Sequence, residues 1–342
     1  MKTVTLGSTK ITAIQNGFGA LPVQRVSVEE GVRLLRLAYE GGMRFFDTAR
    51  AYSNSELKVG EALKIYDRNS LFIATKTHAG NVEEFWKDLK TSLELLQTDY
   101  VDIYQFHQAD QCYKPNDGTG MYEAMLEAKA QGKIRHIGIT SHSFKVALEA
   151  IESGLYETLQ FPFSYLATDI ELNLVEQCRK QNMGFIAMKG LAGGLLTDSE
   201  KCMAFMSQFD NVMPIWGIQR ESELKEWLSY NENTPAYDEG MKSFIEKEKK
   251  ELSGDFCRGC GYCMPCPMDI KINNCARMSL MLRRAPSANW LSESWQKEMF
   301  KIDQCLECYS CASQCPYKLD TPQLLKKNLE DYKAVLSGKK KI

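Results

Sequence analysis

The chain has 342 residues, of which 44% are hydrophobic and 25% are charged, and its formal net charge is −2. This near-neutral balance, with a pI near 6.2, excludes the strongly basic proteins that bind nucleic acid or anionic membranes by charge, so we expect neither as a partner. No segment approaches about 18 uninterrupted apolar residues, and the first residues lack the apolar core of a signal peptide. We therefore expect a cytoplasmic protein without a membrane span.

Short apolar runs alternate with helical patterns through residues 1–235. After a hairpin predicted around Gly7 and Ser8, eight runs predict strands: Ile14–Gly19, Arg44–Thr48, Leu71–Thr75, Val101–Phe106, His136–Thr140, Thr158–Phe161, Gly184–Met188 and Met213–Gly217. Such near-continuous apolar runs are typical of parallel strands buried on both faces. Eight β/α units of this kind predict a (β/α)8 TIM barrel. A doubly wound open sheet is the alternative, but the G-x-G-x-x-G fingerprint after the first strand is absent.

The composition changes after the predicted barrel. Asn231–Lys250 is polar and charged and predicts a linker helix, and further helical patterns follow at Cys275–Leu282, Trp290–Phe300 and Thr321–Leu336. We therefore expect a barrel domain over residues 1–235 and a small ferredoxin-like domain over residues 236–342.

Eight of the twelve cysteines lie in two tight runs within this second region. The runs are Cys257, Cys260, Cys263 and Cys266, followed by Pro267, and Cys305, Cys308, Cys311 and Cys315, followed by Pro316. The second run has the C-x2-C-x2-C-x3-C-P spacing of bacterial ferredoxins, and the first differs by one residue before its last cysteine. This pattern predicts two [4Fe–4S] clusters. Two zinc sites are the alternative, although zinc sites usually separate C-x2-C pairs by a long spacer.

The ferredoxin spacing also predicts how the cysteines are shared. In two-cluster ferredoxins the fourth cysteine of each run ligates the other cluster. Carried over, the first cluster would use Cys257, Cys260, Cys263 and Cys315, and the second Cys305, Cys308, Cys311 and Cys266. Deleting either run should then cost both clusters.

Polar residues lie at the carboxyl ends of three neighbouring strands of the predicted barrel. They are Asp47 with Tyr52 just beyond it, Lys76, and His107, and the carboxyl ends of barrel strands are where active sites lie. A tyrosine can donate a proton to the alkoxide that forms when a carbonyl receives hydride. A lysine would lower the tyrosine pKa, an aspartate would balance the lysine, and a histidine could polarise the carbonyl. His78 has no motif partner and is expected to serve packing or the surface.

Several stretches resemble the aldo-keto reductase family: FFDTARAY, the following ATK, SLELLQTDYVDIYQFH, GKIRHIGITSH and AMKGLAGG. Barrel and two-cluster tail together resemble the iron–sulfur branch of that family. The resemblance implies an NAD(P)H-dependent enzyme in which Tyr52 is the acid, Lys76 and Asp47 tune it, and His107 orients the carbonyl. It also implies a set of nucleotide contacts: Gly19, Ser141, His142, Gln160, Met188, Gly217 and Arg220. Many members have a tyrosine on the nicotinamide ring, where this chain has Met188.

The choice of nucleotide is left open by the segment after the eighth strand. Where the family usually carries a Lys-Ser pair and an arginine for the adenosine phosphate, this chain has Gly217, Ile218 and Glu223. A carboxylate would repel the 2′-phosphate of NADPH, whereas Arg220 could bind it. We therefore expect NADH or NADPH, leaning toward NADH.

The two halves differ in how many electrons they handle. Nicotinamide transfers a hydride, whereas each cluster transfers one electron, and no motif supplies a flavin site to convert between them. We expect an oxidoreductase that reduces an aldehyde or ketone or oxidises the alcohol, with clusters that are structural or serve ferredoxin or another electron-transfer protein. The alternative is a ferredoxin-like electron-transfer protein whose barrel binds another redox cofactor or has a regulatory role. Lys189 is an additional cation after the seventh strand, which we expect to be solvated.

Overall fold

A computed structural model of the chain describes residues 2–252, 256–259, 261, 263–284, 287–315 and 317–342. The chain forms two compact units. The first contains residues 1–190 and 199–238, and the second contains residues 191–198 and 239–342. None of the helices in the described ranges combines the length and the apolar character needed to cross a membrane.

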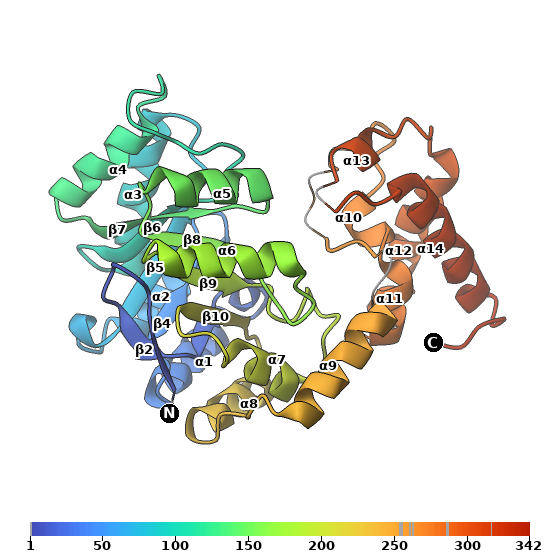
Figure 1. The fold of residues 1–342 in the computed structure, drawn as a ribbon, viewed down its shortest axis with the longest axis horizontal. Coiled ribbons are helices and arrows are strands. Elements are labelled where there is room, and N and C mark those ends of the chain that lie inside the picture. The colour runs from blue at the N-terminus through green and yellow to red at the C-terminus, as the bar shows by residue number, and fades with distance from the viewer. Residues whose placement is uncertain (1, 253–255, 260, 262, 285–286, 316) are drawn as a thin grey trace. The chain divides into compact units, whose positions relative to one another are not determined.

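The first unit is a closed barrel of eight parallel strands with helices between them (Figure 1). Around the barrel the order is β10-β3-β4-β5-β6-β7-β8-β9. The strands are β3 (Gly17–Gly19), β4 (Phe45–Asp47), β5 (Phe72–Thr77), β6 (Val101–Phe106), β7 (Ile134–Thr140), β8 (Thr158–Pro162), β9 (Gly184–Met188) and β10 (Val212–Gly217). This architecture confirms the predicted (β/α)8 barrel.

The first predicted strand is divided in the structure. Ile14 ends β2 (Thr12–Ile14), which pairs antiparallel with β1 (Thr3–Thr5), and the barrel strand β3 begins only at Gly17. The hairpin side chains Val4, Leu6, Ile11 and Ala13 share one buried cluster with residues such as Phe45 at the start of β4. The hairpin therefore covers the amino ends of the strands and leaves the carboxyl ends for the site.

Helices connect the strands, and side-chain caps define several of their starts. They are α1 (Val28–Glu40), α2 (Ser55–Leu63), α3 (Val82–Leu96), α4 (Met121–Ala130), α5 (Phe144–Ser153), α6 (Asp169–Lys180), α7 (Ser199–Met206) and α8 (Glu221–Glu232). Ser27, Asn81 and Ser143 each accept a hydrogen bond from a backbone N–H in the first turn of the helix that follows. Such caps satisfy N–H groups that have no partner within the helix.

The predicted linker begins later than its composition indicated. Asn231 is buried within α8, where its side-chain amide donates to the Gly41 carbonyl at 2.8 Å. The charged helix α9 (Glu239–Leu252) follows and belongs to the second unit. The polarity of Asn231 thus reflects a buried hydrogen bond rather than exposure.

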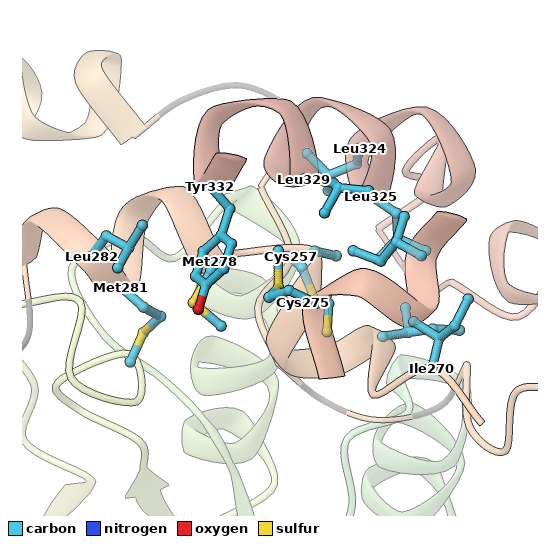
Figure 2. Close-up of a cluster of buried hydrophobic side chains, with 14 of the residues drawn as sticks. Cys257, Ile270, Cys275, Met278, Met281, Leu282, Leu324, Leu325, Leu329 and Tyr332 are labelled. Atoms are coloured by element: carbon cyan, nitrogen blue, oxygen red, sulfur yellow. The ribbon is translucent and has the colours of Figure 1, made fainter. Parts of the chain in front are cut away.

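The second unit is built from short helices around its own core. After α9 they are α10 (Ile272–Cys275), α11 (Met278–Arg284), α12 (Glu293–Phe300), α13 (Ser310–Ser313) and α14 (Thr321–Leu336). Figure 2 shows Cys257 and Cys275 beside Met278 and Tyr332 in this core. The predicted closing helix corresponds to α14, whose bounds match those expected.

Buried polar side chains fasten α14 to the helices beside it. Asn328 donates to the Ala276 carbonyl at 3.1 Å and accepts from the Ser279 N–H at 2.8 Å, and the Tyr332 hydroxyl donates to the Trp290 carbonyl at 2.6 Å. Buried hydrogen bonds of this kind fix one arrangement of the helices.

Candidate active site and cluster sites

A buried ion pair joins β4 and β5 at the carboxyl ends of the barrel strands. Lys76 Nζ donates to Asp47 Oδ1 at 2.7 Å and to the Thr48 carbonyl at 2.6 Å, and both side chains of the pair are nearly inaccessible to solvent. Burial alone would lower the pKa of Lys76, but Asp47 and Tyr52 outweigh it and raise that pKa. Lys76 is therefore held as an ammonium.

Tyr52 lies beside this pair, on the loop after β4. The Lys76 ammonium is 5.1 Å from the centre of the Tyr52 ring. Burial raises the pKa of Tyr52, and Lys76 opposes this increase without cancelling it. Lys76 thus acts in the predicted direction, but the phenol remains protonated at neutral pH, as a proton donor requires.

Two histidines stack next to Tyr52. The rings of His107 and Tyr52 meet edge to face with centres 5.5 Å apart, and the His78 ring stacks on His107 at 4.0 Å. Burial lowers the pKa of His107 to about 2, and Lys76, His78 and His142 add to this effect. His107 is consequently a neutral imidazole, and among the described residues its Nδ1 has no hydrogen-bond partner.

The loop that holds Tyr52 is braced by a buried carboxylate. Glu56 is inaccessible to solvent, forms a salt bridge with Arg50 and accepts a 2.7 Å hydrogen bond from the Thr75 hydroxyl. The Arg50 backbone N–H also donates to the Lys76 carbonyl at 3.0 Å. These contacts tie the segment between Asp47 and Tyr52 to β5.

The predicted carboxamide contacts lie on the neighbouring strands β7 and β8. Ser141 and His142 follow β7 and are buried, and the Ser141 hydroxyl donates to the Ala109 carbonyl at 2.8 Å. Burial, followed by the charge of Lys189, lowers the pKa of His142 to about 3. Gln160 accepts a hydrogen bond from the Gln105 amide at 3.0 Å. Burial raises the pKa of Asp47, and Lys76 and then these two amides oppose this increase without cancelling it.

The other predicted nucleotide residues occupy β3, β9 and β10. Gly19 and Gly217 are register partners at the ends of β3 and β10, and a Cβ on Gly19 would lie 3.2 Å from the Trp216 carbonyl oxygen. Met188 ends β9 and packs partly against the barrel core. The predicted nucleotide contacts therefore lie at strand ends of the same barrel face as Asp47, Tyr52, Lys76 and His107, the predicted catalytic tetrad.

Arg220 and Glu223 pair at the start of α8. Arg220 Nε lies 3.1 Å from Glu223 Oε1, and the Arg220 side chain is 64% exposed. The other Glu223 oxygen accepts hydrogen bonds from the backbone N–H groups of Gln219 at 2.9 Å and Arg220 at 3.1 Å. A carboxylate thus occupies the helix N-terminus, a position that favours anions.

The cysteines of the second unit line two cavities that share Cys263. One is lined by Cys257, Cys263 and Cys315, and the other by Cys263, Cys266, Cys305, Cys308 and Cys311. Cys315 therefore lies with the first run and Cys266 with the second, which is the grouping expected for crossed ligation. Cys260 lies outside the described residues. No three His, Cys, Asp or Glu side chains in the described ranges surround a single point as ligands of one metal ion.

Comparison with known proteins assigns both units. Residues 13–236 match the aldo/keto reductase family, and residues 256–320 match a 4Fe-4S dicluster domain. The chain belongs to the aldo/keto reductase family.

Individual relatives of this aldo/keto reductase share only part of its length. L-galactose dehydrogenase of Arabidopsis thaliana is 30% identical over 56% of the chain and 66% of its own length, and the NADH-specific methylglyoxal reductase of Escherichia coli K12 is 28% identical over 58% and 69%. The chain spans 60 to 66% of the length of four curated relatives. An aldo-keto reductase from Klebsiella pneumoniae, solved with NADPH, has the same fold, with a TM-score of 0.60 and 21% identity over 72% of this chain and 95% of its own.

Two residues of this aldo/keto reductase barrel make contacts near the site that the sequence did not specify. His78 was expected to serve packing or the surface, and it packs its ring on that of His107. Its position two residues after Lys76, at the end of a predicted strand, was the available signal. The burial of Glu56 could not be predicted from the sequence, because a charged residue in a helix usually faces solvent.

Proposed function

We propose that the barrel reduces the carbonyl of a small aldehyde or ketone, or oxidises the corresponding alcohol, with a nicotinamide nucleotide. The observation that supports this activity most directly is the buried Lys76–Asp47 ion pair beside a protonated Tyr52 and a neutral His107. Gly19, Ser141, His142, Gln160, Met188, Gly217 and Arg220 would hold the nucleotide. The buried polar groups near the strand ends support this assignment.

Each residue has one task in the proposed reaction. A nicotinamide nucleotide, when bound, would supply the hydride. Tyr52 gives its proton to the carbonyl oxygen as negative charge develops there, and the Lys76 ammonium stabilises the phenolate that remains. Asp47 holds Lys76 in position and charged. His107, neutral and in contact with the rings of Tyr52 and His78, donates a hydrogen bond to the carbonyl oxygen and orients it.

The pKa directions predict a simple pH profile. Because the pKa of His107 is lowered to about 2 and burial raises the pKa of Tyr52 from its ordinary value, neither group changes charge between about pH 5 and pH 9. We expect kcat/KM for reduction to stay level across this range and to fall only at higher pH, where Tyr52 loses its proton. Anaerobic steady-state rates at fixed ionic strength measure it. An inflection between pH 6 and 7 that disappears in His107→Gln would contradict the neutral role of His107.

We further propose that NADH is preferred over NADPH. Glu223 supports this preference, because its carboxylate occupies the backbone N–H groups at the start of α8 and pairs with Arg220. The name of the Escherichia coli relative agrees with this direction, whereas the Klebsiella pneumoniae structure contains NADPH.

Removing the charge of Glu223 should shift this preference. Glu223→Gln keeps an acceptor for the helix N-terminus and frees Arg220, so we expect the Kd for NADPH to fall by about 3- to 10-fold while that for NADH changes little. Nucleotide fluorescence titration measures both constants, and Glu232→Gln at the other end of α8 is the control. An equal change for both nucleotides would show that Glu223 does not sense the 2′-phosphate.

The second unit is proposed to hold two [4Fe–4S] clusters, one on Cys257, Cys260, Cys263 and Cys315 and one on Cys305, Cys308, Cys311 and Cys266. The cysteine linings of the two cavities support this assignment. A cluster transfers single electrons when bound. We propose ferredoxin or a similar carrier as the external partner if the clusters exchange electrons.

An anaerobic screen tests the proposed activity. Aldehydes, ketones and sugar-derived carbonyls are offered with each nucleotide, including methylglyoxal and an aldose because of the names of two relatives. Turnover with nucleotide alone, retained in protein from which the iron has been removed, supports the proposal. Turnover that requires a reduced one-electron carrier would favour an electron-transfer protein instead.

A further inference from the structure

The segment Leu191–Asp198 lies between two parts of the barrel in sequence but belongs to the second unit. Its Leu195 is fully buried in the core cluster that contains Cys257 and Ile270. Ala192 packs against the same cluster. The segment is therefore part of the core of the second unit, to which Cys257 also belongs.

Both ends of this segment are held in the first unit. Gly190, which precedes it, packs so closely on the Trp216 ring that a Cβ would lie 2.5 Å from the ring. Ser199, which follows it, forms hydrogen bonds with Glu226 and with the Tyr230 hydroxyl, the latter at 2.6 Å. Only eight residues, 191–198, join these fixed points, so a change in the segment reaches Met188 and Lys189 through a short stretch of backbone.

Arg277 binds the segment to the first cysteine run. Its guanidinium donates to the Gly193 carbonyl at 3.0 Å and to the Ala192 carbonyl at 3.5 Å. A Cβ on Gly193 or on Gly259 would lie 2.9 or 2.8 Å from a guanidinium nitrogen, and both glycines have positive φ angles. Gly259 lies between Cys257 and Cys260. The guanidinium is therefore packed between the segment and the cysteine loop.

The charge of Arg277 has no carboxylate partner within the described part of the chain. The residue is only 8% exposed, no described carboxylate forms an ion pair with it, and its Nε has no hydrogen-bond partner among the described residues. A buried charge without a partner is costly. Burial lowers the pKa of Arg277, and Cys257, a proposed cluster ligand, opposes this electrostatically. A cluster held by four thiolates carries net negative charge, so it would supply the missing counter-charge.

We propose that Arg277 is a positioning residue that couples the first cluster to Leu191–Asp198, so that loss of the cluster loosens this segment and weakens nucleotide binding at Met188. This inference rests on the proposed function for its nucleotide site. Its structural half, protection of the segment by the cluster, stands independently of any activity.

Three variants of the anaerobically purified full chain test the coupling. Arg277→Met removes the positive charge and the hydrogen-bond donors, whereas Arg277→Lys keeps the charge but lacks the planar guanidinium with its several N–H donors. Arg283→Met is the control, because Arg283 also lies on α11 but pairs with Asp331. Iron content and visible absorption report the clusters. Mass-spectrometric mapping of limited proteolysis reports cleavage within 191–198, and fluorescence titration reports the nucleotide Kd.

We expect Arg277→Met that retains its iron to be cleaved within 191–198 about 10-fold faster than wild type, since a charged hydrogen bond is lost and cleavage follows the population of the open form. The nucleotide Kd should rise by about 3- to 10-fold, because fewer molecules are competent to bind. Removing iron from the wild type should reproduce both changes and add little to the variant. Arg283→Met should behave like the wild type.

Unchanged cleavage and Kd in iron-replete Arg277→Met would overturn the proposal. If Arg277→Met loses its iron, Arg277→Lys is the deciding variant. We expect Arg277→Lys to contain iron and to be cleaved within 191–198 faster than wild type. The proposal is overturned if Arg277→Lys also lacks iron, or if it is cleaved as slowly as wild type. If wild type binds no nucleotide at all, the proposed function fails, and the cleavage results still decide whether Arg277 couples the cluster to the segment.

Discussion

Replacing Tyr52 with phenylalanine is expected to lower kcat for carbonyl reduction by about 10²- to 10⁴-fold, the usual contribution of a general acid. Phenylalanine keeps the ring that meets His107 edge to face and removes only the hydroxyl. The Lys76–Asp47 pair does not depend on that hydroxyl, because Lys76 also donates to the Thr48 carbonyl. Binding of the nucleotide should therefore change little.

Steady-state kinetics under anaerobic conditions measure this loss, together with nucleotide Kd and iron content. Tyr66→Phe is the matched control, because the Tyr66 hydroxyl forms a hydrogen bond with Glu40 at the surface, away from the strand ends. A reduction of kcat below about 5-fold in Tyr52→Phe would mean that another group donates the proton. His107 would then be the first candidate to replace.

The barrel could be predicted from sequence because buried parallel strands leave a simple signal. Gly184–Met188 is apolar throughout and Val101–Phe106 is apolar except for Asp102 and Gln105, and the structure gives both strands the bounds that were predicted. The tetrad could be predicted for a related reason. Each of its residues follows or ends a strand, and the carboxyl ends of barrel strands meet at one face.

Other features depend on contacts between residues far apart in sequence, which local patterns do not contain. Asn231 looked like the start of a polar linker, but a hydrogen bond to Gly41 buries it in α8. His78 acquires a role only because β6 places His107 beside it. Similarly, only two residues separate LAGGLLTD from the end of a barrel strand, and the burial of Leu195 and the hydrogen bonds from Arg277 associate it with the second unit.

The crossed ligation of the clusters makes the second large prediction. Cys315→Ala should remove one cluster of the two, about four irons per chain, because one thiolate of the first cluster is lost. The informative step is a second substitution. Adding Cys257→Ala should remove little more iron, since both cysteines line the same cavity, whereas adding Cys305→Ala should remove nearly all of it, since Cys305 lines the other.

Iron and sulfide counting with visible spectra measure these differences, and Cys275→Ala is the control, because Cys275 is buried in the same core and lines neither cavity. Separate clusters, each held by one run, would reverse the order of the two double variants. The comparison does not depend on how far each substitution destabilises the second unit, because both pairs contain Cys315→Ala and one further thiol loss. The order alone therefore tells whether Cys315 serves the first cluster, whose counter-charge we assign to Arg277.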